Sequence, residues 1–517
     1  MYSCLTQTLR RAEQVSPNAT ATVSTARRQT YAGFAQRVRR LAGALRRLGL
    51  EPGDRVGMLA LNSDRYLEYY MGVWWAGGVV NPVNTRWSSA EIVYSLDDCD
   101  TRLLLVDDQF SAVVPALLER STCLRTIVHV SDHDTPSSML SYEALVAGGE
   151  PVADAMRCDD DLAGVFYTGG TTGFPKGVML SHGNLLSNAV AGLVEVPMPS
   201  EWNILHVAPL FHLAAMSLVI RTFVRGAAHV ILPAFNPLDV IQVIESERVN
   251  SILLVPTMIQ KVVDHPKLRE HDLSSLEQIL YGASPISEAL LDRALAAFPG
   301  VEFAQGYGMT ELSSGISFLL GHAHTPAGRA DGKLRSVGQA ICGVDVRILD
   351  SEGGELARGK VGEIAVRSPG MMLGYWNKPE ETERALRGGW MHTGDAGYLD
   401  EDGYLYIVDR MKDMIITGAE NVYSAEVENA LASHPAVAAC AVLGIPDEKW
   451  GEAVHAVVVL KEGMRASDED LRLHCRALIA GYKCPRSIEF RSSLPLSGAG
   501  KILKFKLREE YRGSAKH

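Results

Sequence analysis

The sequence predicts an α/β fold in which helices cover mainly parallel β-sheets. Apolar runs typical of buried strands recur at 56–61, 103–106, 126–130 and 230–232, and amphipathic helical patterns separate them. From about residue 336 to residue 408 the pattern changes to short strands and glycine turns, which predicts a small antiparallel β-barrel or sheet. After residue 410 strands and helices alternate again, so a second, smaller α/β unit is expected.

Composition supports a globular protein with more than one domain. The chain has 517 residues, of which 47% are hydrophobic, and a net charge of -11. The negative charge argues against nucleic acid as a partner. Eight scattered cysteines show no metal-ligand spacing, which favours reduced thiols in a cytoplasmic enzyme. Neither a signal peptide nor a transmembrane segment is expected.

One segment is locally basic. Arg37, Arg39, Arg40, Arg46 and Arg47 alternate with apolar residues at helical spacing. This pattern predicts an amphipathic helix with a solvated basic face, and weak contact with a membrane surface is the less favoured interpretation.

The most informative segment is 167–177, which reads Tyr-Thr-Gly-Gly-Thr-Thr-Gly-Phe-Pro-Lys-Gly between two apolar runs. Glycines let backbone N–H groups approach an anion, and the threonines and lysine add donors and charge. The Walker spacing is absent, because a glycine follows the lysine. A glycine-rich surface turn is the alternative to a nucleotide-phosphate loop. The candidate phosphate-binding residues are Thr168, Gly169, Gly170, Thr171, Thr172, Gly173 and Lys176.

Four further motifs follow in order: Gly306-Tyr307-Gly308-Met309-Thr310-Glu311, Thr393-Gly394-Asp395, Asp409-Arg410-Met411-Lys412-Asp413 and Gly500-Lys501-Ile502. Together with the loop they resemble the adenylate-forming superfamily of acyl-CoA synthetases, luciferases and adenylation domains. The resemblance covers essentially the whole chain. It implies an N-terminal adenylation domain at 1–409 with the barrel-like part at 336–408, a hinge at 410–412 and a mobile C-terminal domain at 413–517. A homodimer is compatible with the sequence.

The resemblance implies a first step in which a carboxylate attacks the α-phosphate of ATP. The loop would hold the leaving pyrophosphate, Glu311 would bind Mg²⁺, and Thr310 would contact a phosphate or the metal. Lys501 would reach the carboxylate and the α-phosphate as the catalytic cation. The nucleoside contacts implied by the resemblance are Asp395 and Arg410 at the ribose, and Gly282, Ala283, Ser284 and Tyr307 at the adenine.

In the implied second step, the thiol of coenzyme A attacks the acyl adenylate. Rotation about the hinge residue Lys412 would remove Lys501 from the path of the thiol. The segment Gly418-Ala419-Glu420-Asn421 would then face the pantetheine, with Gly418, Glu420 and Asn421 as the CoA-side residues. Ala419 departs from the glycine that is commoner at this position.

The substrate is a small carboxylic acid whose identity is less well defined. Pro209-Leu210-Phe211-His212 resembles the motif at the mouth of the acyl pocket, and His212 lacks the negative charge that an amino-acid substrate requires. A buried core histidine is the alternative for His212. Gly306 and Gly308 are further expected pocket residues, and Gly308 predicts a pocket deeper than acetate needs, because the acetate-using branch has an aromatic residue there.

These observations predict an AMP-forming carboxylate–CoA ligase that uses ATP, Mg²⁺ and CoA. A medium or long aliphatic acid is the favoured substrate. The alternatives are an aryl acid of the coumarate or ferulate type, and an adenylating enzyme that loads a carrier protein.

Overall fold

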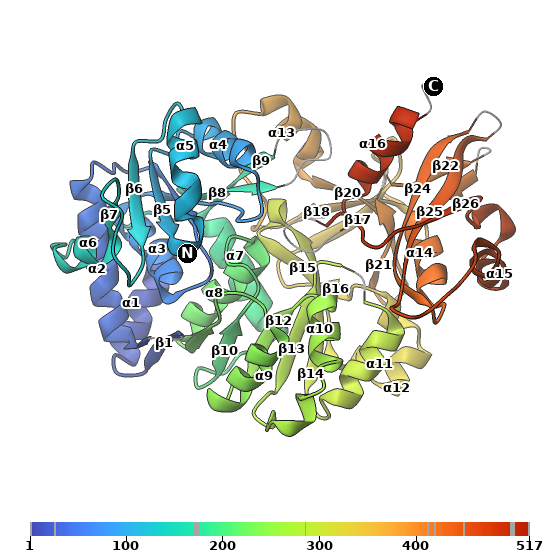
Figure 1. The fold of residues 1–517 in the computed structure, drawn as a ribbon, viewed down its shortest axis with the longest axis horizontal. Coiled ribbons are helices and arrows are strands. Elements are labelled where there is room, and N and C mark those ends of the chain that lie inside the picture. The colour runs from blue at the N-terminus through green and yellow to red at the C-terminus, as the bar shows by residue number, and fades with distance from the viewer. Residues whose placement is uncertain are drawn as a thin grey trace.

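The computed structural model describes residues 3–24, 27–168, 175–284, 286–410, 413–417, 420–447, 450–496 and 502–514. Within these ranges the chain forms four β-sheets with covering helices (Figure 1). The blue to yellow part of the chain forms the larger body, and the last sheet, in orange and red, lies to the right of it in Figure 1. The predicted α/β class is confirmed.

The first large sheet has eight strands in the order β19-β9-β8-β4-β3-β5-β6-β7. Strands β4, β3, β5 and β6 pair in parallel, as the apolar runs predicted, whereas β8 and β9 form an antiparallel hairpin. The hairpin connects 168 to 176 and so carries the predicted phosphate loop. The strands are β3 (Arg55–Leu59), β4 (Val79–Pro82), β5 (Leu103–Asp107), β6 (Thr126–Val130), β7 (Leu140–Ser141), β8 (Leu162–Thr168), β9 (Lys176–Ser181) and β19 (Gly374–Tyr375).

The second large sheet has nine strands in the order β16-β15-β14-β13-β12-β10-β11-β1-β2. Its centre, from β11 to β14, is parallel, so the carboxyl ends of these strands share one edge, where ligands bind in open α/β sheets. The strands are β1 (Thr20–Ser24), β2 (Arg27–Thr30), β10 (Asn203–His206), β11 (Ala228–Ile231), β12 (Ser251–Leu254), β13 (Gln278–Gly282), β14 (Glu302–Met309), β15 (Ser314–Leu319) and β16 (Gln339–Ala340).

Helices cover both large sheets. Their starts follow local sequence: the Ser181 hydroxyl accepts a hydrogen bond from the Asn184 N–H at 3.0 Å, and this cap begins α7 directly after β9. The helices are α1 (Leu5–Val15), α2 (Tyr31–Arg47), α3 (Asp64–Ala76), α4 (Ser89–Asp98), α5 (Val114–Arg120), α6 (Tyr142–Ala147), α7 (His182–Glu195), α8 (Leu213–Arg225), α9 (Pro237–Ser246), α10 (Pro256–Val263), α11 (Glu288–Ala297), α12 (Pro326–Ala330) and α13 (Pro379–Ala385).

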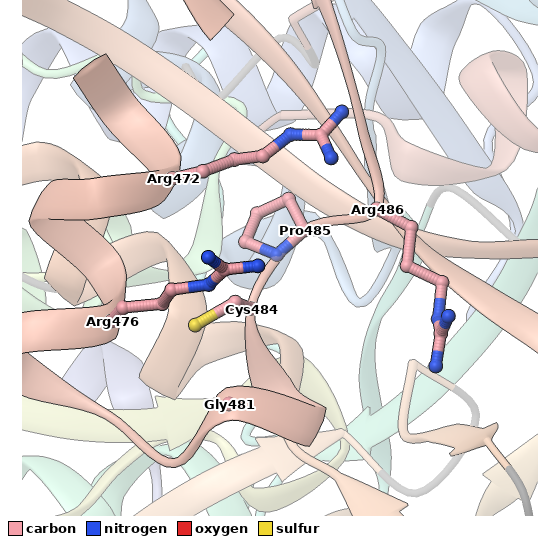
Figure 2. Close-up of a pocket in the computed structure, with 6 residues that line it drawn as sticks. All are labelled: Arg472, Arg476, Gly481, Cys484, Pro485 and Arg486. Carbon is pink, nitrogen blue, oxygen red and sulfur yellow. The ribbon is translucent and has the colours of Figure 1, made fainter. Parts of the chain in front are cut away.

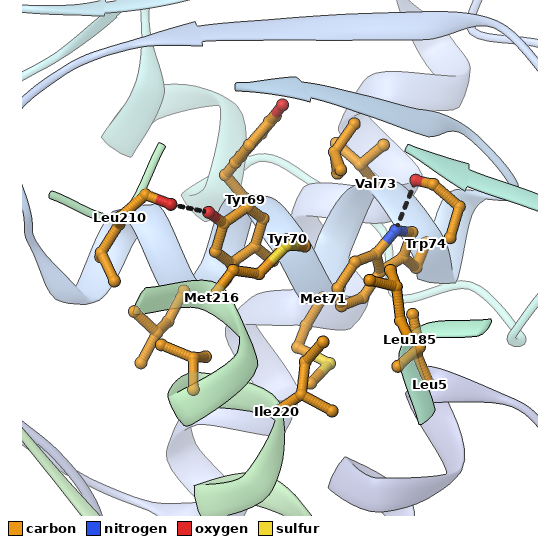
Figure 3. Close-up of a cluster of buried hydrophobic side chains, with 14 of the residues drawn as sticks. Leu5, Tyr69, Tyr70, Met71, Val73, Trp74, Leu185, Leu210, Met216 and Ile220 are labelled. Atoms are coloured by element: carbon orange, nitrogen blue, oxygen red, sulfur yellow. Dashed lines mark hydrogen bonds between the residues drawn. The ribbon is translucent and has the colours of Figure 1, made fainter. Parts of the chain in front are cut away.

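Helix α3 is buried along its whole length and forms the centre of the main core. Trp74 donates its indole N–H to the Ala163 carbonyl at 2.9 Å, and the Tyr70 hydroxyl donates to the Leu210 carbonyl (Figure 3). Buried tyrosine and tryptophan side chains usually satisfy their polar groups in this way. The second contact fixes the backbone two residues before His212, so the core positions the predicted acyl-pocket motif.

The prediction of a solvated basic face on α2 is wrong for most of its arginines. Arg37 pairs with Glu68 at 2.7 Å, and Arg39 pairs with Glu13. Arg40 and Arg46 donate to backbone carbonyl oxygens. The partners are distant in sequence, so the helical pattern alone does not reveal them. Because these guanidinium groups bind within the protein, the helix offers little free charge to a membrane surface.

A third sheet contains four antiparallel strands in the order β17-β18-β20-β21. It occupies the region for which the sequence predicted a barrel or a sheet, and within the described residues β17 and β21 are its outer strands. The strands are β17 (Asp345–Leu349), β18 (Gly362–Arg367), β20 (Met391–Leu399) and β21 (Leu405–Arg410).

The last part of the chain forms a fourth, five-stranded sheet with its own hydrophobic core. A separate core fits the predicted C-terminal domain, whereas its boundary, its hinge and its motion remain predictions. The hinge residue Lys412 lies outside the described residues. The elements are β22 (Ile415–Thr417), β23 (Glu420–Val422), α14 (Ser424–Ala432), β24 (Val437–Asp447), β25 (Gly451–Leu460), α15 (Asp468–Leu478), β26 (Ser487–Phe490) and α16 (Lys504–Ser514).

Two further expectations concern the whole chain. All eight cysteines are free thiols, as predicted. In the part of the chain that the structure describes, no helix has both the length and the apolar character needed to cross a bilayer.

Candidate active site

The two ends of the phosphate loop are held by the β8–β9 hairpin. Thr168 and Lys176 are cross-strand neighbours at its end. The Lys176 ammonium lies 4.9 Å from the ring centroid of Tyr375, over the ring face. The predicted loop residues Gly169, Gly170, Thr171, Thr172 and Gly173 lie outside the described residues, so their contacts with phosphate remain predictions.

Thr310 and Glu311 follow β14 in a short 3₁₀ turn, Thr310–Leu312. The Glu311 side chain is buried, and the Tyr375 hydroxyl donates to its Oε1 at 2.8 Å. No cation among the described residues pairs with this carboxylate. A buried carboxylate without a cationic partner suits a hard divalent ion.

No group of three or more histidine, cysteine, aspartate or glutamate side chains that could hold a metal is present in the described ranges. Glu311 would supply one carboxylate ligand, and Mg²⁺ commonly completes its coordination with water and substrate phosphate oxygens. The residues present fit a metal that arrives with the nucleotide.

Asp395 lies in β20 and is 5% exposed. The Tyr307 hydroxyl, from β14, donates to Asp395 Oδ2 at 2.6 Å, and the Asp395 N–H donates to the Thr393 hydroxyl at 3.1 Å. Asp395 is also the register partner of Arg410, whose side chain the structure does not describe. Two predicted nucleoside residues from distant motifs thus meet at one point.

The predicted adenine residues lie at the carboxyl edge of β13. Gly282 pairs with Gly306 of β14, and a Cβ at Gly282 would lie 2.3 Å from the Gly306 carbonyl oxygen. Ala283 has a positive φ of 66°, which is uncommon for a residue with a side chain and is found preferentially at functional sites. Ser284, half-buried, follows it. The close strand approach explains the glycines and leaves backbone atoms at this edge of the sheet.

His212 forms the N-cap of α8, and its Nδ1 accepts from the Ala214 N–H at 3.3 Å. It is half-buried, so both its expected role at the acyl pocket and the alternative of a core histidine remain predictions. Gly306 lies opposite Phe318 in the β14–β15 pairing, and a Cβ at Gly306 would lie 3.0 Å from the Phe318 ring. The Phe318 ring therefore packs against one of the residues predicted to line the acyl pocket.

Gly308 packs against the neighbouring strand β15, which corrects the expectation that its missing side chain deepens the acyl pocket. A Cβ at this position would lie 1.6 Å from the Ser314 carbonyl oxygen, in the neighbouring strand β15. The glycine is required by the close approach of two backbones, at a register shift between Tyr307 and Gly308. A side chain at Gly308 would therefore meet β15, and the absent side chain is no measure of pocket depth.

The predicted residues of the second step are described only in part. Lys501 and Gly418 lie outside the described residues. Glu420 and Asn421 belong to β23, which pairs with β22, and nothing is described of their side chains. Their roles remain predictions.

Sequence reasoning missed a basic cavity of about 270 Å³ in the C-terminal part (Figure 2). Arg472 and Arg476 come from one face of α15, and Arg486 comes from the segment before β26. Arg472 pairs with Asp468 at 2.6 Å, and the Arg486 guanidinium lies 4.5 Å from the Trp450 ring centroid. No carboxylate among the described residues pairs with Arg476. The sequence did contain one indication of this cluster, because Arg472 and Arg476 are four residues apart and therefore share a helix face.

Tyr375 was also missed. It lies in a strand of two residues, too short for a periodic pattern, and its side chain contacts Lys176 and Glu311, which are distant in sequence.

A large and a small α/β part, a hairpin at the ends of the predicted phosphate loop, and buried acids after β14 and in β20 fit an adenylate-forming enzyme. The chain belongs to the AMP-binding enzyme family, which it matches over residues 9–376, with the AMP-binding enzyme C-terminal domain matching residues 426–501. Its relatives are named CoA synthases and ligases, and the chain is an AMP-forming acid–CoA ligase.

Three comparisons show the range of relatives. The chain is 42% identical to a feruloyl-CoA synthase of Amycolatopsis sp, over 97% of this chain and 98% of the relative. It is 37% identical to the fatty acid–[acyl-carrier-protein] ligase ScoC of Streptomyces coeruleorubidus, over 99% and 97%. The solved anthranilate CoA ligase AuaEII in complex with anthranoyl-AMP has a TM-score of 0.91 at 28% identity, with 100% and 98% of the chains covered.

Proposed function

We propose that this ligase activates an aryl acid of the ferulate or coumarate type, forming first the acyl adenylate and then the CoA thioester. The observation that carries the proposal is the Phe318 ring, which lies next to Gly306. The Phe318 ring faces this glycine from the neighbouring strand, and Gly315 also leaves room for the ring, with its Cβ position 3.4 Å away. A flat ring beside glycine backbone favours a planar substrate, because aromatic rings stack.

Similarity supports the same choice, since the 42% identical relative is a feruloyl-CoA synthase. The sequence alone favoured a medium or long aliphatic acid, and the 37% identical relative is a fatty acid ligase. An aliphatic acid is therefore the second candidate.

In the proposed first step, ATP binds with its adenine at the carboxyl edge of β13 and its ribose at Asp395. Lys176 and the loop hold the leaving pyrophosphate, and Glu311 would hold Mg²⁺, whose charge would offset that of the phosphates. Lys501 neutralises the acid and the α-phosphate. The contacts with the phosphates and the carboxylate are electrostatic, and they lie where negative charge accumulates.

For the second step, the cavity of Arg472, Arg476 and Arg486 supports CoA as the thiol donor. Figure 2 shows the Arg476 guanidinium beside Cys484, with Arg472 above it. CoA carries phosphate groups that a guanidinium without an ion pair can bind, because arginine recognises phosphate through paired donors. A carrier protein brings its pantetheine without the nucleotide of CoA.

The proposal is tested with a panel of acids: ferulate, coumarate, benzoate, decanoate and palmitate. Thioester formation is followed with ATP, Mg²⁺ and either CoA or a carrier protein bearing pantetheine. We expect the highest kcat/KM for ferulate or coumarate with CoA. Preference for decanoate or palmitate would overturn the aryl assignment, and transfer to the carrier protein alone would overturn the assignment of CoA.

A variant pair tests the cavity separately. Arg476→Glu should raise the KM for CoA about tenfold or more, because one charge-assisted contact is lost and repulsion is added, while adenylation is unchanged. Arg465→Glu is the matched control, since this arginine is exposed in the same part of the chain. Equal effects of the two variants would exclude a specific CoA contact at the cavity.

A further inference from the structure

The short segment 372–376 connects two parts of the site. One is the 3₁₀ turn that carries Glu311, and the other is the β8–β9 hairpin that carries Lys176. The Met372 N–H donates to the Glu311 carbonyl at 2.8 Å, which fixes one end of the segment to the 3₁₀ turn. At the other end, the Trp376 N–H donates to the Gly177 carbonyl at 2.7 Å, one residue after Lys176. The backbone of this segment therefore sets the distance between the turn and the hairpin.

The side chain of Tyr375 also connects the turn and the hairpin, because it contacts the charged groups of both Glu311 and Lys176. Its hydroxyl donates to Glu311 Oε1 at 2.8 Å, and its ring face lies under the Lys176 ammonium at 4.9 Å. One ring thus contacts an anion through its polar edge and a cation through its face, the two arrangements that the charge distribution of a phenol favours.

The surroundings hold Tyr375 in place. It is 8% exposed, and its N–H donates to the Thr382 hydroxyl at 2.9 Å. Its hydroxyl is the donor of the hydrogen bond to Glu311. With one carboxylate oxygen of Glu311 fixed by this donor, the rotation of the carboxylate is restricted and its other oxygen has a defined direction.

We propose that Tyr375 is a positioning residue that fixes both Lys176 and Glu311 at the pyrophosphate side of the site. The inference rests on the proposed function, because it concerns the same adenylation step. Tyr375 itself contacts neither substrate nor metal. It acts by orienting the Glu311 carboxylate toward Mg²⁺ and by holding Lys176 near the phosphate loop until the nucleotide binds.

Two substitutions separate the two contacts. Tyr375→Phe keeps the ring beneath Lys176 and removes only the hydroxyl. The Glu311 carboxylate should then lose its fixed orientation, and Mg²⁺-dependent binding of ATP should weaken. Tyr375→Leu removes the ring as well. The matched control is Tyr142→Phe, because the buried Tyr142 hydroxyl donates to the Glu68 carboxylate at 2.7 Å and lies in another part of the fold.

The readout is binding of ATP measured by calorimetry without any acid, with and without Mg²⁺, together with the melting temperature. Tyr375→Phe should weaken binding about tenfold in the presence of Mg²⁺, the scale of a hydrogen bond to a charged group, and leave binding without Mg²⁺ unchanged. Tyr375→Leu should weaken binding under both conditions. Tyr142→Phe should lower the melting temperature without changing the Mg²⁺ dependence.

A second measurement uses Glu311→Gln alone and combined with Tyr375→Phe. If Tyr375 acts through Glu311, the combined variant should bind ATP with Mg²⁺ no more weakly than Glu311→Gln alone. Additive losses, or a Tyr375→Phe variant with the affinity of the wild type, would overturn the positioning role. Failure of the wild type to form an acyl adenylate with any acid would instead overturn the proposed function, so the two failures are distinguishable.

Discussion

The Tyr307 hydroxyl donates a hydrogen bond of 2.6 Å to the Asp395 carboxylate and so joins β14 of the second large sheet to β20 of the antiparallel sheet. The two residues are 88 positions apart in sequence. Their contact brings the predicted adenine residue and the predicted ribose residue to the same place. It also orients one oxygen of a buried carboxylate before any nucleotide binds.

The first prediction concerns this pair. Asp395→Asn should weaken ATP and AMP binding about tenfold or more, because an amide accepts hydrogen bonds on one atom only while a carboxylate accepts on two. Tyr307→Phe should weaken binding less. Calorimetry with ATP and AMP measures both effects. The control is Asp345→Asn, an exposed aspartate of the same sheet that pairs with Arg367. Wild-type affinity of Asp395→Asn would remove this residue from the ribose site.

The second prediction distinguishes two glycines of β14. Gly308→Ala should lower the melting temperature for every ligand state, because its Cβ would lie 1.6 Å from a backbone oxygen of β15. Gly306→Ala should disturb the fold less, since the atoms that its Cβ meets at 3.0 Å belong to the Phe318 side chain and not to a backbone. The kcat/KM values across the acid panel should change for Gly306→Ala.

The combination of Gly306→Ala with Phe318→Leu is the matching control, because leucine restores space in front of the new methyl group. If Gly308→Ala melts at the wild-type temperature, the close contact with β15 is not present in solution. An unchanged acid preference in Gly306→Ala would place the acyl group elsewhere.

The third prediction separates the half-reactions through Lys501. Lys501→Ala should slow adenylation on the order of a hundredfold, the scale of losing one preorganised electrostatic contact. Thioester formation from supplied acyl adenylate should persist, because the lysine is not expected at the site in that step. Rapid-quench assays of each half-reaction provide the measurement. Equal losses in both half-reactions would contradict a rotation about Lys412.

The fourth prediction concerns stability in acid. Arg37 lies 2.9 Å and Arg65 lies 2.7 Å from oxygens of Glu143. Burial by itself raises the pKa of Glu143, but the hydrogen bonds and charges of the two arginines outweigh burial and lower it to about 2. The usual value is 4.5. The ionised group therefore stabilises the fold above pH 4.5, and this contribution is lost as the pH falls to about 2.

Glu143→Gln should consequently lower the melting temperature at neutral pH. Its melting temperature should also fall less steeply than that of the wild type between pH 4.5 and pH 2. The control is Glu355→Gln, since Glu355 is an exposed partner of Arg347. Parallel curves for wild type and Glu143→Gln would show that this carboxylate does not contribute.

Much of the fold follows from local pattern. The runs at 103–106 and 126–130 are strands because buried parallel strands are continuously apolar, and the observed β5 and β6 match them within one residue. Helix α15 likewise begins at Asp468 directly after a Ser467 cap, in the region where alternating strands and helices were expected. Such elements depend on residues close in sequence.

The errors arise where partners are distant in sequence. The sequence predicted a solvated face for the arginines of α2, because no nearby residue indicates that they pair with Glu13 and Glu68. The sequence suggested that Gly308 leaves space in the acyl pocket, because the strand pairing that places β15 next to it cannot be inferred from local sequence. Tyr375 carried no signal in a strand of two residues. Tertiary contacts, which a local pattern does not contain, decided each case.

The most direct test of the central claim is exchange of labelled pyrophosphate into ATP, measured with Mg²⁺ and one acid at a time. Reversible adenylation predicts exchange only when an acid is present, with ferulate or coumarate faster than decanoate or palmitate, and AMP release only after CoA is added. Folded protein that shows no acid-dependent exchange with any of these acids would contradict the account.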